Sequence, residues 1–281
     1  MLYTGGRRAD FGLRKWRKTV TEATPITTTL AGHVLRIHVD HEKKLNSFTP
    51  EMFGQLSGAL AELEETEDAW VGVLTFQGKH TTAGLDLPKF AGAMARGRDA
   101  DESPDDRPDP FALRRRCRKP LVMAVQGICY TIGIEMALAA DIVVAAEDAR
   151  FAQLEPRRGL AVFGGAHVRY VQRAGWGNAM YHLLRADEFD AQRALALGFV
   201  QEVVPAGDQI DRALELAEEI CECAPLAVRE IKRAAQVYLE EGEQAAYREI
   251  PAMRARTANS ADFAEGVASF VERRKAKFQG R

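Results

Sequence analysis

The sequence predicts an α/β fold that ends in a helical segment, and three observations carry this prediction. Apolar runs rich in β-branched residues lie at 70–76, 121–127 and 142–146, and such runs are typical of buried strands in a parallel sheet. Glycine-containing loops and helix-forming stretches lie between these runs. No strand-like run follows residue 208, where the apolar spacing is helical. Strands that alternate with helices indicate an α/β protein.

The first elements of the chain are a basic tail, a hairpin and a helix. Residues 1–24 carry six arginine and lysine residues and predict a basic N-terminal tail. Residues 26–39 contain β-branched runs on both sides of a glycine turn, which predicts a β-hairpin. Thr49 and Pro50 are typical of an N-cap and a first helical position, so a helix is expected from there to about Glu65.

Two loops follow the strand predicted at 70–76. Ligands of α/β proteins bind at the carboxyl ends of parallel strands, which is where the loop at 77–90 lies. Gly84 allows a sharp turn that leaves the N–H of the next residue free to point at a ligand. Residues 91–111 are polar, acidic and proline-bearing, and they predict a mobile loop or lid, or a plain surface insertion. The basic run at 114–119 is predicted on a helix end.

The stretch from Gly127 to Glu155 is predicted as a loop, a helix from Ile132, a strand and a turn. The first turn of a helix has unpaired N–H groups and the positive end of the dipole, so it can stabilise an anion. Glu135 lies in this first turn, and Glu155 follows the next strand. If the fold brings them together, the site has an anion-binding helix end and two carboxylates. The alternative is that Glu135 only complements the helix dipole.

The remaining chain is predicted to complete the core and then become helical. A glycine-rich turn after Glu155 leads into an amphipathic helix, and a helix capped by Asp190 and ended by Gly198 precedes the last strand. This divides the chain into an α/β core at 25–207 and a helical C-terminal subdomain at 208–281. Four helices are expected there, at 208–223, 225–242, 244–256 and 260–278.

Length and composition exclude several classes of protein. The 281 residues, 46% hydrophobic and 28% charged, are ordinary for a soluble globular chain of one large domain or a domain with an appendage. A net charge of −2 argues against nucleic-acid binding by bulk charge, and no apolar run is long enough to span a membrane. Four cysteines form no disulfide framework and no metal-ligand cluster. A cytoplasmic protein without a metal is expected, and an organelle-targeting role of the tail is the alternative.

Six segments in this order resemble the crotonase superfamily, the enoyl-CoA hydratase/isomerase family, and the resemblance covers residues 26–278. It implies a crotonase-like spiral of repeated ββα units, and a C-terminal subdomain used in trimerisation. It also implies an acyl-CoA thioester substrate, a homotrimer or dimer of trimers, and no cofactor, because coenzyme A is part of the substrate. The segments are KKLNSF, TTAGLDL, AVQGICYTIGIEMALAADIVVA, FAQLEPRRGL, DAQRALALGFVQEVVP and EGVASFVERRKAKF.

The resemblance also implies roles for individual residues. Water addition to an enoyl thioester builds negative charge on the thioester oxygen, which the backbone N–H groups of Leu85 and Ile132 would stabilise. Glu135 would hold the water and Glu155 would give a proton to C2, with the roles open to sharing. Family members often have a run of glycines where Thr131-Ile132-Gly133 stands here. This departure bears on the room at the α-carbon of the substrate.

Further residues are implied in substrate binding. Lys43, Lys44 and Leu45 would lie near the nucleotide of coenzyme A, although exposed lysines are as often only solvated. Lys275 and Phe278 would reach the ligand of a neighbouring subunit. The residues implied around the thioester and the acyl chain are Ala83, Gly84, Asp86, Leu87, Phe90, Gly133 and Phe163.

The retention of both glutamates predicts an enoyl-CoA hydratase, a hydro-lyase. Two alternatives stay open: an isomerase that uses one glutamate, or a non-catalytic acyl-CoA binding protein, for which the unusual Arg157 and Arg158 leave room. The absence of an acid between residues 156 and 166 disfavours the dehalogenase and dienoyl-isomerase branches. No serine lies at the donor loops, which disfavours a peptidase of the same fold. The acyl chain and the pathway stay undetermined by sequence.

Overall fold

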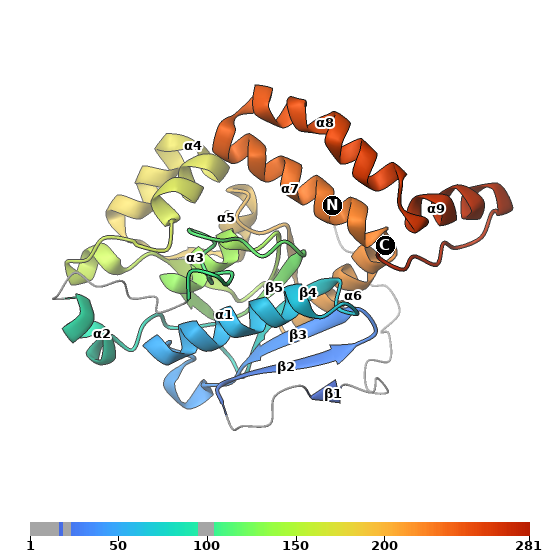
Figure 1. The fold of residues 1–281 in the computed structure, drawn as a ribbon. Coiled ribbons are helices and arrows are strands. Elements are labelled where there is room, and N and C mark those ends of the chain that lie inside the picture. Colours follow the sequence, from blue (N-terminus) through green and yellow to red (C-terminus); the bar gives the residue numbers. More distant parts are fainter. Residues whose placement is uncertain (1–16, 19–23, 95–103) are drawn as a thin grey trace.

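The main sheet is a seven-stranded, largely parallel sheet in the order β1-β2-β3-β4-β5-β7-β10 (Figure 1). The computed structural model describes residues 17–18, 24–94 and 104–281. β2 and β3 form the predicted antiparallel hairpin, and β3, β4, β5, β7 and β10 then run parallel to one another. The strands are β1 Arg17–Lys18, β2 Ile26–Ala31, β3 Val34–Val39, β4 Val71–Phe76, β5 Leu121–Val125, β7 Ile142–Ala146 and β10 Glu202–Val204.

A second sheet of short strands gives the core its repeat. It contains β6 (Ile128–Tyr130), β8 (Arg150–Ala152) and β9 (Phe189–Asp190) in that order. β5 is followed by β6 and then helix α3, and β7 is followed by β8 and then helix α4. After β4, a bridge between Thr82 and Cys129 takes the place of the second strand. This recurring strand–strand–helix order confirms the predicted crotonase-like fold.

Helices cover both faces of the main sheet, because the alternating side chains of its buried strands are apolar on both sides. Val73 packs in the cluster with α6, whereas the next residue, Leu74, packs in the larger cluster with α1 and α3. The helices of the core are α1 Pro50–Glu65, α2 Leu87–Met94, α3 Ile132–Ala139, α4 Ala166–Arg185 and α5 Ala191–Ala196; the later ones are α6 Gln209–Cys221, α7 Pro225–Glu241, α8 Glu243–Ala258 and α9 Ala261–Glu272.

The last three helices extend from the core as an arm (Figure 1). α7 and α8 lie side by side, and α9 continues beyond them at the far end. The four predicted helices are therefore present, although α9 ends at Glu272 instead of continuing to residue 278. Its C-cap, Arg273, has the left-handed φ of 54° that ends a helix.

Two predictions for residues 91–119 need correction. α2 continues to Met94, so the expected loop begins as a helix, and residues 95–103 lie outside the described residues. Residues 114–119 are irregular, not a helix end. The buried carboxylate of Asp109 accepts hydrogen bonds from the backbone N–H groups of Phe111, Leu113, Arg114 and Arg115, at 2.9 to 3.1 Å. These bonds hold the backbone in a turn that competes with helix.

The predicted basic tail is described only at its strand β1, which pairs antiparallel with β2; the rest of residues 1–24 lies outside the described residues apart from Thr24. None of the described helices is long and apolar enough to cross a membrane.

Candidate active site

One pocket of about 240 Å³ lies where three loops of the core meet. The first loop follows β4 and leads into α2, the second leads from β6 into α3, and the third follows β8. Because these are the carboxyl ends of parallel strands and their short partners, the pocket lies where an α/β fold places ligands. It is lined by Ala83, Leu85, Leu87, Thr131, Ile132, Leu154, Glu155, Arg158, Leu160 and Phe163.

The loop around Gly84 is built so that the N–H of Leu85 stays available. Phe48 donates its N–H to the carbonyl of Gly84, and Asp86 donates its N–H to the carbonyl of Phe48, both at 2.9 Å. These two bonds hold the residues on each side of Leu85, whose own N–H has no acceptor within the described residues. Gly84 has φ +108°, a conformation that other residues rarely adopt.

The second free N–H belongs to Ile132, the first residue of α3. The carbonyl of Thr131 accepts from the N–H groups of Ile134 and Glu135, whereas the N–H of Ile132 has no acceptor within the described residues. This is the anion-binding end of a helix. Leu85 and Ile132 line the same pocket, so the two donors predicted from sequence do meet in one site.

Thr131, which sequence reasoning did not assign to the site, lies between these two donors. Its φ of 50° and ψ of −112° are strained for a β-branched residue. Its hydroxyl is buried without a hydrogen-bond partner, and it occupies the space where a Cβ at position 84 would be. The conformation of Thr131 therefore depends on glycine at position 84.

Glu135 lies behind the pocket, where its side chain is closely packed. Its side chain has no solvent exposure, and one carboxylate oxygen accepts from the N–H of Ala166 at 3.1 Å. A Cβ on Gly164 would lie 2.7 Å from the carboxyl carbon and 2.8 Å from the ring of Phe111, so both pack against this glycine. The carboxyl of Glu135 is thus fixed by the start of α4 and the ring of Phe111.

Glu155 lines the pocket directly. It opens the 3-10 helix Glu155–Arg158, has 5% exposure, and neither carboxylate oxygen has a partner among the described residues. Its carboxylate is therefore unpaired at the pocket wall. An unpartnered buried carboxylate is costly to fold around and is a common feature of functional sites.

Burial raises the pKa of both carboxyl groups. The pKa of Glu135 rises to about 8, mainly through burial and further through the nearby charge of Glu155. The pKa of Glu155 rises to about 7 through burial. With these pKa values, Glu135 holds a proton and Glu155 is ionised between about pH 7 and 8, so the two carboxyl groups together carry one proton there. The pair can then both accept and donate a proton.

The predicted residues on the 3-10 helix Glu42–Lys44 and the one directly before α2 do not line the pocket. Lys43, Lys44 and Leu45 are exposed on a 3-10 helix, and the carbonyl of Leu45 accepts from the N–H of Ala83 at 3.0 Å. This bond ties the predicted nucleotide-binding segment to the pocket loop. Asp86 is half-buried before α2.

Gly133 and Phe90 are buried and do not line the pocket. A Cβ on Gly133 would lie 2.7 Å from the methyl of Thr82 and 3.0 Å from the sulfur of Cys129, so this glycine lets α3 pack closely. Phe90 packs against Phe53 in the core, with ring centroids 6.0 Å apart. Both positions support the site through packing.

Lys275 and Phe278 lie away from the pocket within one chain. Lys275 pairs with Glu222 at 2.8 Å. Phe278 packs on the cluster that contains Trp70 and Val71, at the beginning of β4, whereas the pocket loop follows the other end of that strand. The structure of one chain therefore does not bring these two residues to the site.

Several residues of the site were missed by sequence reasoning. Leu154, Leu160 and Arg158 line the pocket, and Gly164 contacts the carboxyl of Glu135. Arg158 and Gly164 lie in segments that the sequence analysis singles out, but only the fold shows that Arg158 lines the pocket and that Gly164 contacts Glu135.

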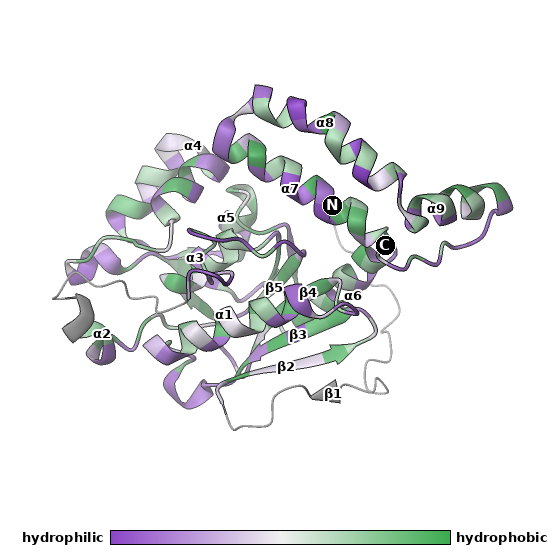
Figure 2. Ribbon diagram, in the orientation of Figure 1, coloured by the Kyte–Doolittle hydropathy of each residue, from purple (hydrophilic) through white to green (hydrophobic). Residues whose placement is uncertain are grey.

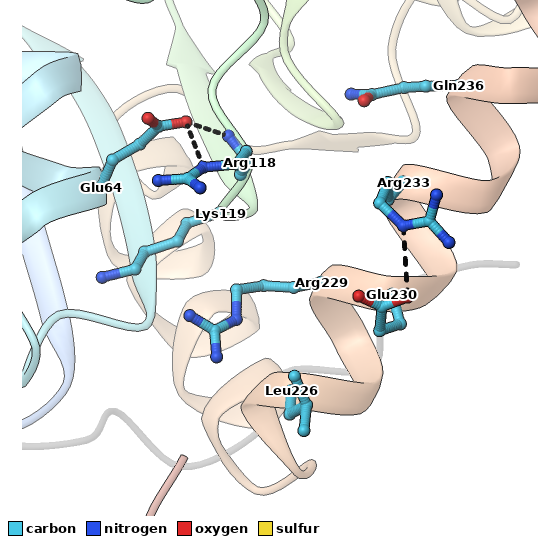
Figure 3. Close-up of a pocket in the computed structure, with 8 residues that line it drawn as sticks. All are labelled: Glu64, Arg118, Lys119, Leu226, Arg229, Glu230, Arg233 and Gln236. Carbon is cyan, nitrogen blue, oxygen red and sulfur yellow. Dashed lines mark hydrogen bonds and ion pairs between the residues drawn. The ribbon is translucent and has the colours of Figure 1, made fainter. Parts of the chain in front are cut away.

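A second pocket, of about 260 Å³, lies between α7 and the segment before β5 (Figure 3). Glu64 accepts from the N–H of Arg118 at 2.6 Å, Lys119 donates to the carbonyl of Thr66 at 2.7 Å, and Arg233 pairs with Glu230 at 3.2 Å. The first two bonds tie the end of α1 to the segment before β5, and the third lies within α7, so these bonds have a structural role. No group of three or more His, Cys, Asp or Glu side chains in the described ranges is arranged to hold a metal ion.

Comparisons with known proteins agree with this architecture. The family model for enoyl-CoA hydratase/isomerase matches residues 29–281. The enoyl-CoA hydratase EchA19 of Mycobacterium tuberculosis is 32% identical over 89% of this chain and 94% of its own length. The 2,3-dehydroadipyl-CoA hydratase of Escherichia coli is 29% identical over 88% of this chain and 96% of its own length.

A solved structure is similar throughout. That of a probable enoyl-CoA hydratase/isomerase from Mycobacterium abscessus is 40% identical, covers 92% of this chain and all of its own, and has a TM-score of 0.89. The chain therefore belongs to the enoyl-CoA hydratase/isomerase family.

Proposed function

We propose that the protein is an enoyl-CoA hydratase that adds water across the 2,3 double bond of a 2-enoyl-CoA thioester. The observation that carries the proposal is a pocket lined by two free backbone donors and the buried carboxyl of Glu155, with the buried carboxyl of Glu135 behind it. The donors suit an oxygen that gains charge, and the carboxyl groups suit the two proton transfers that hydration requires.

The donors act on the thioester oxygen. When water attacks C3, electrons move through C2 and the carbonyl, and the thioester oxygen becomes an enolate oxygen. The N–H groups of Leu85 and Ile132 would donate to that oxygen without reorganising, because their backbones are already held by neighbouring bonds. Such a pre-organised pair stabilises the transition state more than the ground state.

The carboxyl pair moves the protons. Glu135 accepts a proton from the water as it attacks C3, and Glu155 gives its proton to C2, so the pair returns with one proton in total. With pKa values of about 8 for Glu135 and about 7 for Glu155, the pair carries the one proton that this exchange needs between about pH 7 and 8. That proton lies mainly on Glu135 and has to lie on Glu155 for this step, so the reaction starts from the less populated arrangement. These steps need neither electron transfer nor a Lewis acid, so we propose no cofactor, and coenzyme A is part of the substrate. Lys43 and Lys44 would bind its phosphates.

One observation favours a second candidate, an enoyl-CoA isomerase. Glu155 lines the pocket, but Glu135 lies behind it, with no exposure and its carboxyl packed against Gly164 and Phe111. A single glutamate can move a proton between C2 and C4 of a 3-enoyl thioester without using water. Glu155 would then act alone.

Heavy-oxygen water distinguishes the two candidates. We would incubate the protein with a panel of 2-enoyl-CoA thioesters in this water and follow the enone absorbance and the product mass. A hydratase yields a 3-hydroxyacyl product that carries the label. Unlabelled products throughout the panel, with conversion of a 3-enoyl thioester to the 2-enoyl form, would instead establish the isomerase. Tight acyl-CoA binding without either reaction would leave only a binding protein.

The two raised pKa values predict a narrow pH profile. We expect kcat/KM for hydration to be bell-shaped, with its maximum between about pH 7 and 8, because the active pair carries one proton. Below this range both carboxyl groups are protonated and no base remains; above it, both are ionised and no acid remains. Initial rates across the pH range measure the profile. A flat profile from pH 5 to 9 would contradict a pair that carries one proton.

The same groups link stability to pH. From their ordinary value of 4.5 up to about 8, the folded protein binds more protons than the unfolded chain. The free energy of unfolding therefore falls as pH rises through this window. The fall should be smaller in a Glu135→Gln variant, which can be measured by denaturant unfolding at each pH.

We also propose that the chain assembles as a homotrimer or a dimer of trimers through its helical arm. Much of the ribbon of α9 has the colour of hydrophobic residues (Figure 2). Its exposed apolar residues recur at helical spacing, namely Phe263, Val267, Phe270 and Val271, and Phe270 is 85% exposed and Val271 73% exposed. Contiguous exposed apolar surface of this kind usually marks an interface. The family resemblance suggests the number of subunits.

A charge on this surface should break the assembly. We expect Phe270→Glu to lower the molar mass measured by sedimentation, because the interface would have to bury an unpaired carboxylate. Gln244→Glu, on an exposed polar position of α8, is the matched control and should leave the mass unchanged. A monomeric wild-type protein would contradict the proposed assembly.

A further inference from the structure

A single cationic side chain, that of Arg158, lines the active-site pocket described above. Glu155 is the other lining residue that can carry charge. Most of the remaining wall is apolar and includes Leu87, Leu160 and Phe163. The Arg158 side chain is itself exposed, so its guanidinium meets water at the edge of this largely apolar wall.

Arg158 has no carboxylate partner among the described residues. Its guanidinium donates only to the carbonyl of Arg157, at a long 3.4 Å. It does not pair with Glu155, since both oxygens of that carboxylate lack partners. The two residues stand at opposite ends of one short 3-10 helix, which keeps the cation and the catalytic carboxylate apart while both line the pocket. The charge of Arg158 is therefore available to a ligand.

The position of Arg158 identifies which part of a ligand it can reach. The thioester oxygen is bound by the N–H groups of Leu85 and Ile132, and these donors, Glu155 and Arg158 share one small pocket. The exposed lysines on the 3-10 helix Glu42–Lys44 do not line this pocket. Arg158 thus lines the pocket in which the thioester would lie, whereas those lysines do not line it.

We propose that the preferred substrate is a 2-enoyl-CoA whose acyl chain ends in a carboxylate, and that Arg158 binds that carboxylate. This inference rests on the proposed function and names the substrate class of the same pocket. A terminal carboxylate forms a charge-assisted, potentially bidentate pair with the guanidinium, which a terminal methyl cannot do. A methyl end would instead desolvate the guanidinium without compensation.

The test compares matched thioesters and matched variants. Pairs of 2-enoyl-CoA thioesters of equal chain length, one ending in a methyl and the other in a carboxylate, are offered to wild-type, Arg158→Met and Arg157→Met proteins. Arg157 is the neighbouring arginine, exposed like Arg158, and it does not line the pocket, so it controls for the loss of one positive charge nearby.

We expect wild-type kcat/KM to favour the carboxylate-ended thioester, and Arg158→Met to lower that value about 10- to 100-fold. The methyl-ended thioester should change little or improve, and Arg157→Met should resemble wild type. A preference for the methyl-ended thioester in wild type would overturn the proposal. An equal loss for both thioesters in Arg158→Met would also overturn it, because Arg158 would then bind the phosphates of coenzyme A. In that case pantetheine thioesters, which lack the nucleotide, would react equally well with wild type and Arg158→Met.

Binding separates this inference from the proposed reaction. Saturated acyl-CoA pairs with the two chain ends cannot be hydrated, and their dissociation constants can be measured by calorimetry. Tighter binding of the carboxylate-ended analogue, lost in Arg158→Met and kept in Arg157→Met, supports the substrate class even if no hydration occurs. Equal affinities together with normal hydration of methyl-ended thioesters would reject the substrate class and leave the proposed function intact.

Discussion

The Glu155→Gln variant is expected to lose hydration activity by about a hundredfold or more, because general acid–base catalysis by one positioned group contributes about 10² to 10⁴ in rate. Glu155 lines the pocket and neither carboxylate oxygen has a hydrogen bond to lose within the described residues, so glutamine can occupy the same space. The protein should fold normally, and the loss should fall on kcat more than on KM.

Glu135→Gln is the companion variant, and it separates the two candidate reactions. The amide oxygen of glutamine can still accept from the N–H of Ala166, so α4 stays in place. A hydratase should lose activity in both variants, whereas an isomerase should lose it only in Glu155→Gln. Glu147→Gln, on an exposed turn after β7, is the control and should behave as wild type. Full hydration by both site variants would exclude the two-carboxylate mechanism.

The Gly84→Ala variant is expected to lower kcat by about 10² to 10³, the usual effect of losing one oxyanion donor. Position 84 has φ +108°, which alanine adopts only with strain, and the added Cβ would overlap the hydroxyl of Thr131. Either the loop or the start of α3 must move, so the N–H groups of Leu85 and Ile132 can no longer meet one oxygen.

Gly32→Ala is the matched control for backbone strain. Gly32 also has a left-handed φ, of +56°, but a Cβ there would meet no atom within 4 Å. We expect it to cost about 1 kcal/mol of stability and no activity, measured by denaturant unfolding and initial rates. If Gly84→Ala lost only as much activity as Gly32→Ala, the Leu85 donor would have no part in catalysis.

The strands and most helices could be predicted because their apolar spacing is local. The run at 71–76 is buried at every position, and α1 begins at Pro50 and ends at Glu65 as its start signal and periodicity indicate. Asp190 accepts the N–H of Arg193 as an N-cap, as expected from its place before a helix. Each of these elements depends on residues within a few positions of one another.

Elements that depend on contacts outside the local apolar spacing were predicted less well. The run at 114–119 has helix-forming residues, but the carboxylate of Asp109 draws its N–H groups into a turn, which local propensity does not express. Phe90 follows the pocket loop in sequence, but it packs against Phe53 of α1 in the core. In both cases a contact made after folding outweighs the local pattern.

The sequence by itself determined the α/β repeat, the helical arm and the chemistry-bearing motifs, because periodicity, caps and ordered motif segments are all local properties. Only the tertiary structure decided that Leu85, Ile132 and Glu155 share one pocket while Glu135 lies behind it. Only the tertiary structure showed that Arg158 lines the pocket and that Arg157 does not. The physical reason is that exposure, free hydrogen-bond donors and pKa depend on which distant segments pack together, and adjacent residues in a chain can face opposite environments.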